Sequence, residues 1–305
     1  MALWWSPDDV SACIGALRTA GLIEPAAELT LLGEGFGSVA LETSDQVVIL
    51  VAKNEIGARA RRVSVSLLPE VGPVLPCEAP SPLWSIDLAV GIPWGAWGYR
   101  KLPGRVMTDA DAPDTPQSVA EDIGRFVAAL HKFPVHRAEK AGAPEVQELH
   151  DDLRLLRAQV VPVLRQRLRE DEFLRVEEWW RRFIEVSLER LPSVLTHGDL
   201  FPQNLLVSDD NSRLTGVLDW GDAAIADAAY DFATLQAFGN RFSELAMSSY
   251  LTQGVSKPEG FETRVQLYWE LRSSSFFSLR ASIRENDEVE IEHCLQELRG
   301  GPILS

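Results

Sequence analysis

The sequence predicts an α+β fold of two lobes, an N-terminal lobe with an antiparallel sheet and a helix, and a larger, mainly helical C-terminal lobe. Three observations support this prediction. Apolar residues alternate with period two in short segments up to about residue 101. Leu102-Pro103-Gly104 then gives a turn signal, and longer segments with helical spacing follow it. We therefore expect the N-terminal lobe at residues 1–101 and the C-terminal lobe at residues 102–305.

The N-terminal lobe is predicted to be a β-meander that follows a first helix. This helix starts at Ser6-Pro7-Asp8-Asp9, where Ser6 can cap it and Pro7 fits its first position. Strands are expected up to residue 32, over residues 39–43 and 47–52, within the proline-rich stretch 69–93 and near residues 97–101. A second helix is expected over residues 57–68.

The C-terminal lobe is predicted to contain long helices around one hairpin. Helical spacing covers residues 119–131, 151–169 and 173–191, and it returns from about residue 228 to the end. Trp179 and Trp180 are expected to pack in the core. Two short apolar strands, at residues 205–207 and 214–218, flank a polar turn and therefore predict a β-hairpin.

Composition limits the possible partners of the chain. The 45 acidic residues outnumber the 29 basic ones, and this net charge of −16 disfavours nucleic acids and acidic membranes but favours a cationic small molecule. An acidic surface that only maintains solubility is the alternative. The three cysteines are too few and too widely spaced for a disulfide framework or a thiolate metal site. Without a membrane span or a basic signal region, we expect a cytoplasmic protein, monomeric or else dimeric.

The most informative stretch is His197-Gly198-Asp199-Leu200-Phe201-Pro202-Gln203-Asn204, which leads into the predicted hairpin. Asn204 precedes the first strand of this hairpin, and Asp219 follows the second. Because paired strands lie about 4.8 Å apart, both side chains emerge at its open end. Two oxygen ligands there suit Mg²⁺, which completes its shell with phosphate and water. Asp199, on a loop that enters the same end, can orient or deprotonate an attacking hydroxyl.

These residues match the chemistry of phosphoryl transfer, in which a loop aspartate, an asparagine five residues later and a metal-binding aspartate serve one in-line displacement. The alternative is a simple turn, since Gly, Asp and Asn are common turn residues. The four fixed positions His-Gly-Asp and Asn should occur by chance in about one chain in a thousand of this size. His197 is expected to hold the loop by hydrogen bonds rather than to act as an acid or base.

A glycine loop, Gly33-Glu34-Gly35-Phe36-Gly37-Ser38, joins the first two predicted strands. The backbone amides of Gly35, Gly37 and Ser38 could cover nucleotide phosphates, and Lys53 at the end of the third strand could pair with them as a point charge. A plain hairpin turn and a solvated strand-end lysine are the alternatives.

Together these segments resemble the aminoglycoside phosphotransferase family, which contains small-molecule kinases with a bilobal, protein-kinase-like fold. The resemblance covers nearly the whole chain. Its carriers are residues 197–204, 217–223 and 226–233, supported by residues 33–35, 99–104 and 126–131. It implies that Asp199 is catalytic, that Asn204 and Asp219 bind Mg²⁺, that Gly33 belongs to the nucleotide-binding loop, and that the backbone of Arg100 and Leu102 holds the base of ATP or GTP. Asp231 is implied to brace the lobe.

The N-terminal lobe departs from the family pattern. Counted from Gly33 without gaps, the family's third-strand Lys or Arg falls on Leu50, and Lys53 follows three residues later on the opposite face of a strand. The partner glutamate is missing, since the helix offers Val63-Ser64-Val65-Ser66 where it would stand. A one-residue bulge that turns Lys53 round, another phosphate-binding group, or a low nucleotide affinity would each explain this pattern.

The predicted function is transfer of the γ-phosphate of ATP or GTP to a hydroxyl of a small cationic antibiotic, an aminoglycoside in first place, as in antibiotic resistance. Candidate carboxylates for its ammonium groups are Asp151 and Asp152 at a helix start, Asp222, and Glu270, each of which has the alternative role of a solvated or capping acid. A macrolide, a peptide antibiotic or a metabolic alcohol would use the same catalytic segment. A non-catalytic nucleotide- or ligand-binding module on a kinase scaffold is the alternative from another class.

Overall fold

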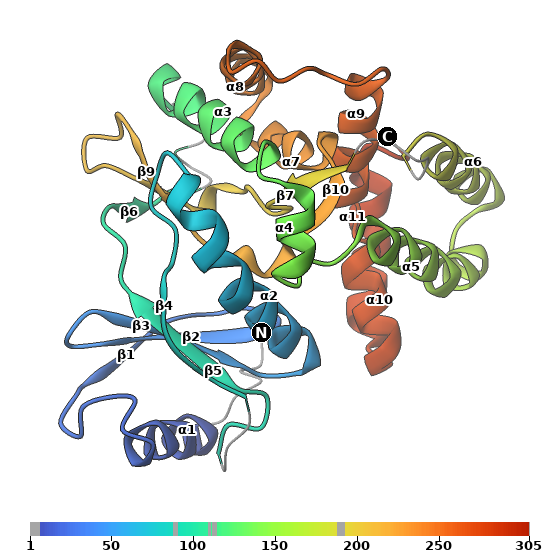
Figure 1. Ribbon diagram of the computed structural model, residues 1–305. Coiled ribbons are helices and arrows are strands. Elements are labelled where there is room, and N and C mark those ends of the chain that lie inside the picture. Colours follow the sequence, from blue (N-terminus) through green and yellow to red (C-terminus); the bar gives the residue numbers. More distant parts are fainter. Residues whose placement is uncertain (1–6, 88–90, 109–110, 112–114, 188–192, 305) are drawn as a thin grey trace.

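A computed structural model of the chain describes residues 7–87, 91–108, 111, 115–187 and 193–304. Figure 1 shows an N-terminal lobe built on an antiparallel sheet and a mostly helical C-terminal lobe. The predicted fold class is therefore confirmed. Ser6, the expected cap of the first helix, and residues 188–191, the expected end of a later helix, lie outside the described residues.

Antiparallel strands form the sheet of the N-terminal lobe in the order β1-β2-β3-β5-β4. They are β1 (Leu29–Glu34), β2 (Ser38–Thr43), β3 (Val47–Ala52), β4 (Pro82–Ile86) and β5 (Ala96–Arg100). The central strand β3 pairs with β2 on one side and with β5 on the other, and its register is unbroken on both sides. The predicted meander and the two later strands are confirmed.

The two faces of this sheet contact different cores because side chains alternate along each strand. Val47, Ile49 and Val51 of β3 share one core with α1 (Pro7–Thr19) on the outer face. Val48 of β3 and Tyr99 of β5 belong instead to the large core that continues into the C-terminal lobe. Helix α2 (Glu55–Val71) joins this large core, and Figure 1 shows it between the sheet and the helices of the C-terminal lobe.

Helices make up most of the C-terminal lobe. They are α3 (Gln117–His131), α4 (Val135–Lys140), α5 (Val146–Arg167), α6 (Glu170–Ser187), α7 (Ala229–Thr234), α8 (Asn240–Thr252), α9 (Phe261–Ser273), α10 (Phe276–Glu285) and α11 (Glu288–Gly300). The predicted helices are present, and Trp179 and Trp180 of α6 are buried as expected. No helix in the described ranges has the length and apolar character that a membrane span requires.

The expected start of α5 was wrong. The helix begins at Val146 rather than at residue 151, because Glu145 and Glu148 form a capping box at its N-terminus. Asp151 and Asp152 therefore lie inside the helix and cannot cap its first turn.

Short strands position the functional loops of the C-terminal lobe. β8 (Leu205–Val207) and β9 (Leu214–Val217) form the predicted hairpin, and β6 (Arg105–Val106) pairs with the outer side of β8. β7 (Ser193–Thr196) pairs with β10 (Ala224–Asp227), which brings the segments before and after this hairpin together.

The glycine loop is anchored to the start of α2. Lys53 N donates to Gly37 O at 2.8 Å, and Asn54 Nδ2 donates to Phe36 O at 3.0 Å. Asn54 also caps α2, since its Oδ1 accepts a hydrogen bond from Gly57 N at 3.0 Å, and the helix therefore starts two residues earlier than predicted. Gly57 and Gly37 lie so close that a Cβ on Gly57 would clash with the carbonyl of Gly37.

We expect Gly57→Ala to displace the glycine loop and to destabilise the protein by about 1–3 kcal/mol, the usual cost of overpacking. Gly15→Ala is the matched control, because Gly15 lies within helix α1 and a Cβ there meets no atom within 4 Å. This control should be neutral or stabilising by about 0.5–1 kcal/mol. Equilibrium unfolding in urea measures both variants, and equal stabilities would contradict the close approach.

Candidate active site

The loop after β7 carries the predicted catalytic segment, and His197 ties this loop to the end of β9. The ring is completely buried; its Nε2 donates to Leu218 O at 2.9 Å, and its Nδ1 accepts from Asp199 N at 3.3 Å. Burial lowers the pKa of His197, although the nearby Asp231 carboxylate opposes this effect. The ring is therefore neutral, and its two nitrogens hold this loop in place through hydrogen bonds.

A buried carboxylate, Asp231 of α7, holds the backbone of the same loop. Its Oδ2 accepts from His197 N at 3.1 Å, and its Oδ1 accepts from Gly198 N at 2.7 Å. His131 Nε2 lies 3.1 Å from Oδ2, and the other ring nitrogen of His131 lies 3.0 Å from the Tyr250 hydroxyl. Gly198 has a φ of +82°, a conformation that favours glycine. The turn before Asp199 therefore depends on Gly198 for its conformation and on Asp231 for its hydrogen bonds.

Asn204 and Asp219 meet at the open end of the β8–β9 hairpin. The pairing of Leu205 with Val217 and the bond from Leu218 N to Asn204 O at 2.8 Å align the two residues. Asn204 Nδ2 donates to the backbone oxygen of Asp199 at 2.8 Å and to its Oδ2 at 2.6 Å. The amide oxygen of Asn204 is thereby left available to another partner.

Three carboxylates influence one another at this end of the hairpin. Burial, together with Asp222 and Asp219, raises the pKa of Asp199 to about 6, although Arg272 and Asn204 act in the opposite direction. Crowding by protein atoms and the nearby Asp222 raise the pKa of Asp219, although its side chain still reaches solvent. Among the described residues, no three His, Cys, Asp or Glu side chains form a metal cage. The pair Asn204 and Asp219 provides two hard oxygen donors, a set that suits Mg²⁺.

Arg272 of α9 forms an ion pair with Asp199 at the centre of this site. Its guanidinium contacts Asp199 Oδ1, and both side chains are 18% exposed. It also interacts electrostatically with the buried Tyr230 and lies 5.3 Å from the centre of the Phe201 ring. Asp199 is therefore held on Oδ1 by Arg272 and on Oδ2 by Asn204.

The glycine loop is closed by its own hydrogen bonds. Gly35 N donates to Ser38 O at 2.9 Å, so this amide is engaged within the loop. Gly33 lies in strand β1 opposite Ala40 and Ser38 lies in β2 opposite Ala52, while Gly37 accepts from the Lys53 amide. The exposed Phe36 stands between these glycines.

Lys53 has a partner that the sequence did not reveal. Its Nζ lies 2.7 Å from Glu34 Oε1 of the glycine loop, and the two side chains are only 7% and 17% exposed. Leu50, at the position of the family's cation, pairs with Ala40 and Trp97 and packs against the large core. The possibility of a bulge that turns Lys53 round is wrong, because the register of β3 is unbroken.

The backbone expected to bind the nucleotide base follows β5. Arg100 ends this strand opposite Val47, and its guanidinium donates to Asp45 O at 3.1 Å. The Lys101 amide donates to Gln46 O at 2.9 Å, and the partly buried Leu102 packs against the large core. Hydrogen bonds to residues 45 and 46 and packing against the large core thus fix the backbone of residues 100–102.

Three of the four candidate substrate acids already have partners away from Asp199. Asp151 pairs with Arg154 at 3.1 Å, and Asp152 pairs with Arg280 at 3.0 Å. Glu270 accepts from Trp179 Nε1 at 2.7 Å and from Gln266 at 2.9 Å. The exposed Asp222 is the candidate that lies close enough to Asp199 and Asp219 to raise the pKa of both, and it makes no ion pair with another described residue.

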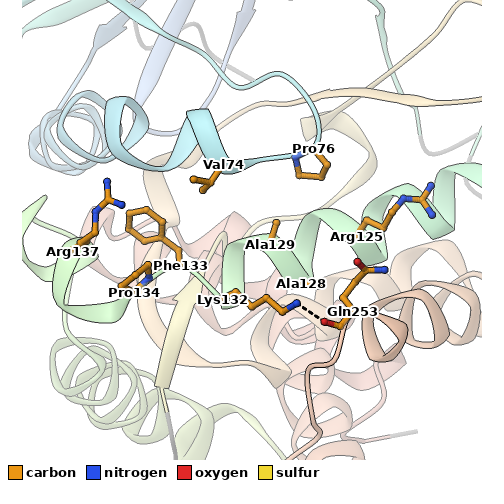
Figure 2. Close-up of a pocket in the computed structure, with 10 residues that line it drawn as sticks. All are labelled: Val74, Pro76, Arg125, Ala128, Ala129, Lys132, Phe133, Pro134, Arg137 and Gln253. Carbon is orange, nitrogen blue, oxygen red and sulfur yellow. Dashed lines mark hydrogen bonds between the residues drawn. The ribbon is translucent and has the colours of Figure 1, made fainter.

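A separate pocket of about 440 Å³ lies away from these residues, between the end of α2, α3 and α4 (Figure 2). Its three cations are already engaged: Arg125 with Asp122, Lys132 with Gln253 O, and Arg137 with Glu70. None of the predicted site residues lines it.

The comparison with protein families shows to which family the chain belongs. Residues 58–261 match the model of the phosphotransferase enzyme family. The chain belongs to this family. A viomycin phosphotransferase of Streptomyces vinaceus is 25% identical over 88% of this chain and 95% of that protein. The uncharacterized protein YcbJ of Bacillus subtilis is 44% identical over 59 residues, 19% of each chain.

Solved structures agree with the bilobal fold of this phosphotransferase. The GDP complex of wild-type aminoglycoside 2'-phosphotransferase-IIIa superposes with a TM-score of 0.81 at 24% identity, over 94% of this chain and 96% of that chain. Macrolide 2'-phosphotransferase MphH from Brachybacterium faecium gives a TM-score of 0.69 at 21% identity, over 92% and 97%. The streptomycin–ATP–APH(2")-IIa ternary complex gives 0.67 at 18% identity, over 90% and 92%. The resemblance to this class of kinases is confirmed.

Sequence reasoning missed two residues that pair with candidate site residues: Arg272, which pairs with Asp199, and Glu34, which pairs with Lys53. A signal for Arg272 was present: Arg264, Tyr268 and Arg272 recur every four residues on one face of α9, and the first two are almost completely buried. Arg264 pairs with the buried Asp227 at 2.6 Å. A cation on the apolar face of a helix predicts a buried acidic partner, although it does not say which one.

We expect Asp231→Asn to lose about 2–5 kcal/mol of stability, because an amide can satisfy only part of a site that receives several buried donors. It should also lower phosphotransfer, since the loop before Asp199 loses its anchor. Equilibrium unfolding measures the first effect, and Glu244→Gln on the exposed side of α8 is the matched control. A stability equal to that of the control would contradict the bracing role.

Proposed function

We propose that this phosphotransferase moves the γ-phosphate of ATP or GTP to a hydroxyl of a small cationic antibiotic, an aminoglycoside in first place. The observation that carries this proposal is the convergence of Asp199, Asn204 and Asp219 at one end of the β8–β9 hairpin. The fold of relatives that bind GDP, ATP and streptomycin supports it. Viomycin is the second candidate acceptor, because a viomycin phosphotransferase matches most of the chain.

In the proposed reaction, Asp199 orients the acceptor hydroxyl for in-line attack on the γ-phosphorus. A new oxygen–phosphorus bond forms as the bond between the γ-phosphorus and the β–γ bridging oxygen breaks. ADP or GDP leaves, and the hydroxyl proton passes to Asp199 and then to solvent. The Asn204 amide oxygen and the Asp219 carboxylate would hold Mg²⁺, which would neutralise charge on the phosphates.

The N-terminal lobe, residues 1–101, is the proposed nucleotide-binding lobe, and residues 102–305 are the proposed catalytic and acceptor-binding lobe. We assign the nucleotide to the glycine loop, with Gly33, Gly35, Gly37 and Ser38, and to the backbone of Arg100 and Leu102. The Gly35 amide would have to leave Ser38 O to reach a phosphate. Lys53 would meet the phosphates from its ion pair with Glu34, as other kinase lysines are held by a carboxylate. The donor nucleotide is consistent with action in the cytoplasm.

Asp222 is the carboxylate that we assign to a cationic acceptor. It reaches solvent beside the catalytic segment, whereas Asp151, Asp152 and Glu270 are engaged elsewhere. The net charge of −16 supports attraction of such an acceptor at long range.

We expect the protein, incubated with Mg²⁺ and ATP or GTP, to add one phosphate to an aminoglycoside or to viomycin, as detected by mass spectrometry. Macrolides and metabolic alcohols complete the panel. Asp199→Ala should lower kcat by a factor of about 10³ or more, since it removes the group that directs the hydroxyl. If no acceptor is phosphorylated and Mg²⁺–nucleotide does not bind at millimolar concentration, a non-catalytic scaffold is the correct description.

We expect Asp222→Asn to raise KM for a cationic acceptor about 5–50-fold, because the amide removes a charge that faces an ammonium group. KM for the nucleotide should change far less. Asp151→Asn is the matched control, since Asp151 already pairs with Arg154 on an exposed face of α5 and should leave both KM values unaltered. Equal effects of the two variants on acceptor KM would rule out Asp222 as the recognition group.

A further inference from the structure

The ion pair between Arg272 and Asp199 is not a surface contact. Each side chain is 18% exposed, whereas the comparable pair of Arg280 with Asp152 leaves the carboxylate 47% exposed. An arginine placed beside the central carboxylate of a site requires a structural or chemical reason, because desolvation of both charges is costly.

We propose that Arg272 is a positioning residue that fixes the orientation of Asp199 for phosphoryl transfer. This inference rests on the proposed function, in which Asp199 directs the acceptor hydroxyl. Arg272 would act through Asp199 and not on the nucleotide.

The first support is the division of the Asp199 oxygens. Arg272 holds Oδ1 from α9, and Asn204 holds Oδ2 from the start of β8, so the carboxylate cannot rotate about its Cβ–Cγ bond without losing a charge-assisted bond. A carboxylate oxygen has two acceptor positions. Each oxygen can therefore still accept the acceptor hydroxyl while the plane of the group stays fixed, and fixed geometry is the main protein contribution to this reaction.

The second support is that Arg272 is itself fixed. Its guanidinium is held by the ion pair with Asp199, lies against the Phe201 ring, and interacts electrostatically with Tyr230, which is buried next to the bracing residue Asp231. A side chain with several partners on different elements loses its freedom when the protein folds and not when the substrate arrives. The arrangement is therefore preorganised.

The third support is the local charge. Asp219 and Asp222 both repel the negative form of Asp199, and Arg272 is the described cation that offsets them there. A guanidinium next to the reacting hydroxyl also repels an ammonium group at that position. Arg272 should thus favour an acceptor whose cationic groups lie away from the reacting hydroxyl, toward Asp222.

Steady-state kinetics of Arg272→Gln and Arg272→Lys test the proposal. We expect Arg272→Gln to lower kcat about 10²-fold, with KM for the nucleotide unchanged within about twofold and KM for a cationic acceptor unchanged or lower. Arg272→Lys keeps the charge and should recover part of kcat. Arg284→Gln, an exposed arginine on α10, is the matched control.

A double-mutant cycle separates positioning from a purely structural role. Wild type, Arg272→Gln, Asp199→Asn and the double variant are compared by residual phosphotransfer and by unfolding temperature. If Arg272 acts through Asp199, its replacement has little further effect in the Asp199→Asn background, and the two temperature shifts are not additive.

Three results are decisive. An active wild type with Arg272→Gln at wild-type kcat overturns the role of Arg272 and leaves the proposed function intact. Additive losses in the cycle also overturn it. A wild type that phosphorylates no acceptor, with non-additive unfolding temperatures, overturns the proposed function and with it the catalytic role of Arg272, although the ion pair itself is then present.

Discussion

The geometry of the site depends on one buried carboxylate. Asp231 is completely buried and accepts hydrogen bonds from the amides of His197 and Gly198, while His131 contacts it from α3. A loop with a left-handed glycine just before Asp199 would otherwise leave buried amides without acceptors. Asp231 therefore links α7 and α3 to the position of Asp199, the proposed catalytic residue, and the His197 ring extends the link to the hairpin.

The second constraint is charge. The hairpin and the loop after it bring Asp199, Asp219 and Asp222 close together, and like charges at short range raise one another's pKa. Arg272 offsets part of this repulsion from within the protein. In the proposed function, a divalent cation bound by the Asn204 and Asp219 oxygens would offset the rest.

The N-terminal lobe pairs its candidate phosphate-binding cation with a carboxylate of the glycine loop. Leu50, the position where the gapless count from Gly33 places the family's cation, packs against the large core. Val63-Ser64-Val65-Ser66 of α2 stand where the partner glutamate is expected. Lys53 pairs instead with Glu34, so cation and anion both belong to the rim of the glycine loop. The Lys53 amide and the Asn54 side chain both donate hydrogen bonds to the glycine loop. Because these two residues are neighbours in one turn, they keep Lys53 close to Glu34.

The sequence by itself determined the secondary-structure elements and the segment that carries the proposed catalytic residue, because both depend on short-range patterns. A short apolar run after a polar turn predicted β3, and helical spacing predicted α3. The positions of Asn204 and Asp219 around two apolar strands predicted that they meet at the hairpin. The capping box at Glu145 was also local, and its omission misplaced the start of α5. Tertiary structure alone decided which charges meet: Asp199 with Arg272, Lys53 with Glu34, and Asp152 with Arg280. These partners lie far apart in the chain, and the packing of α9, α10 and the sheet brings them together, so no local period records them.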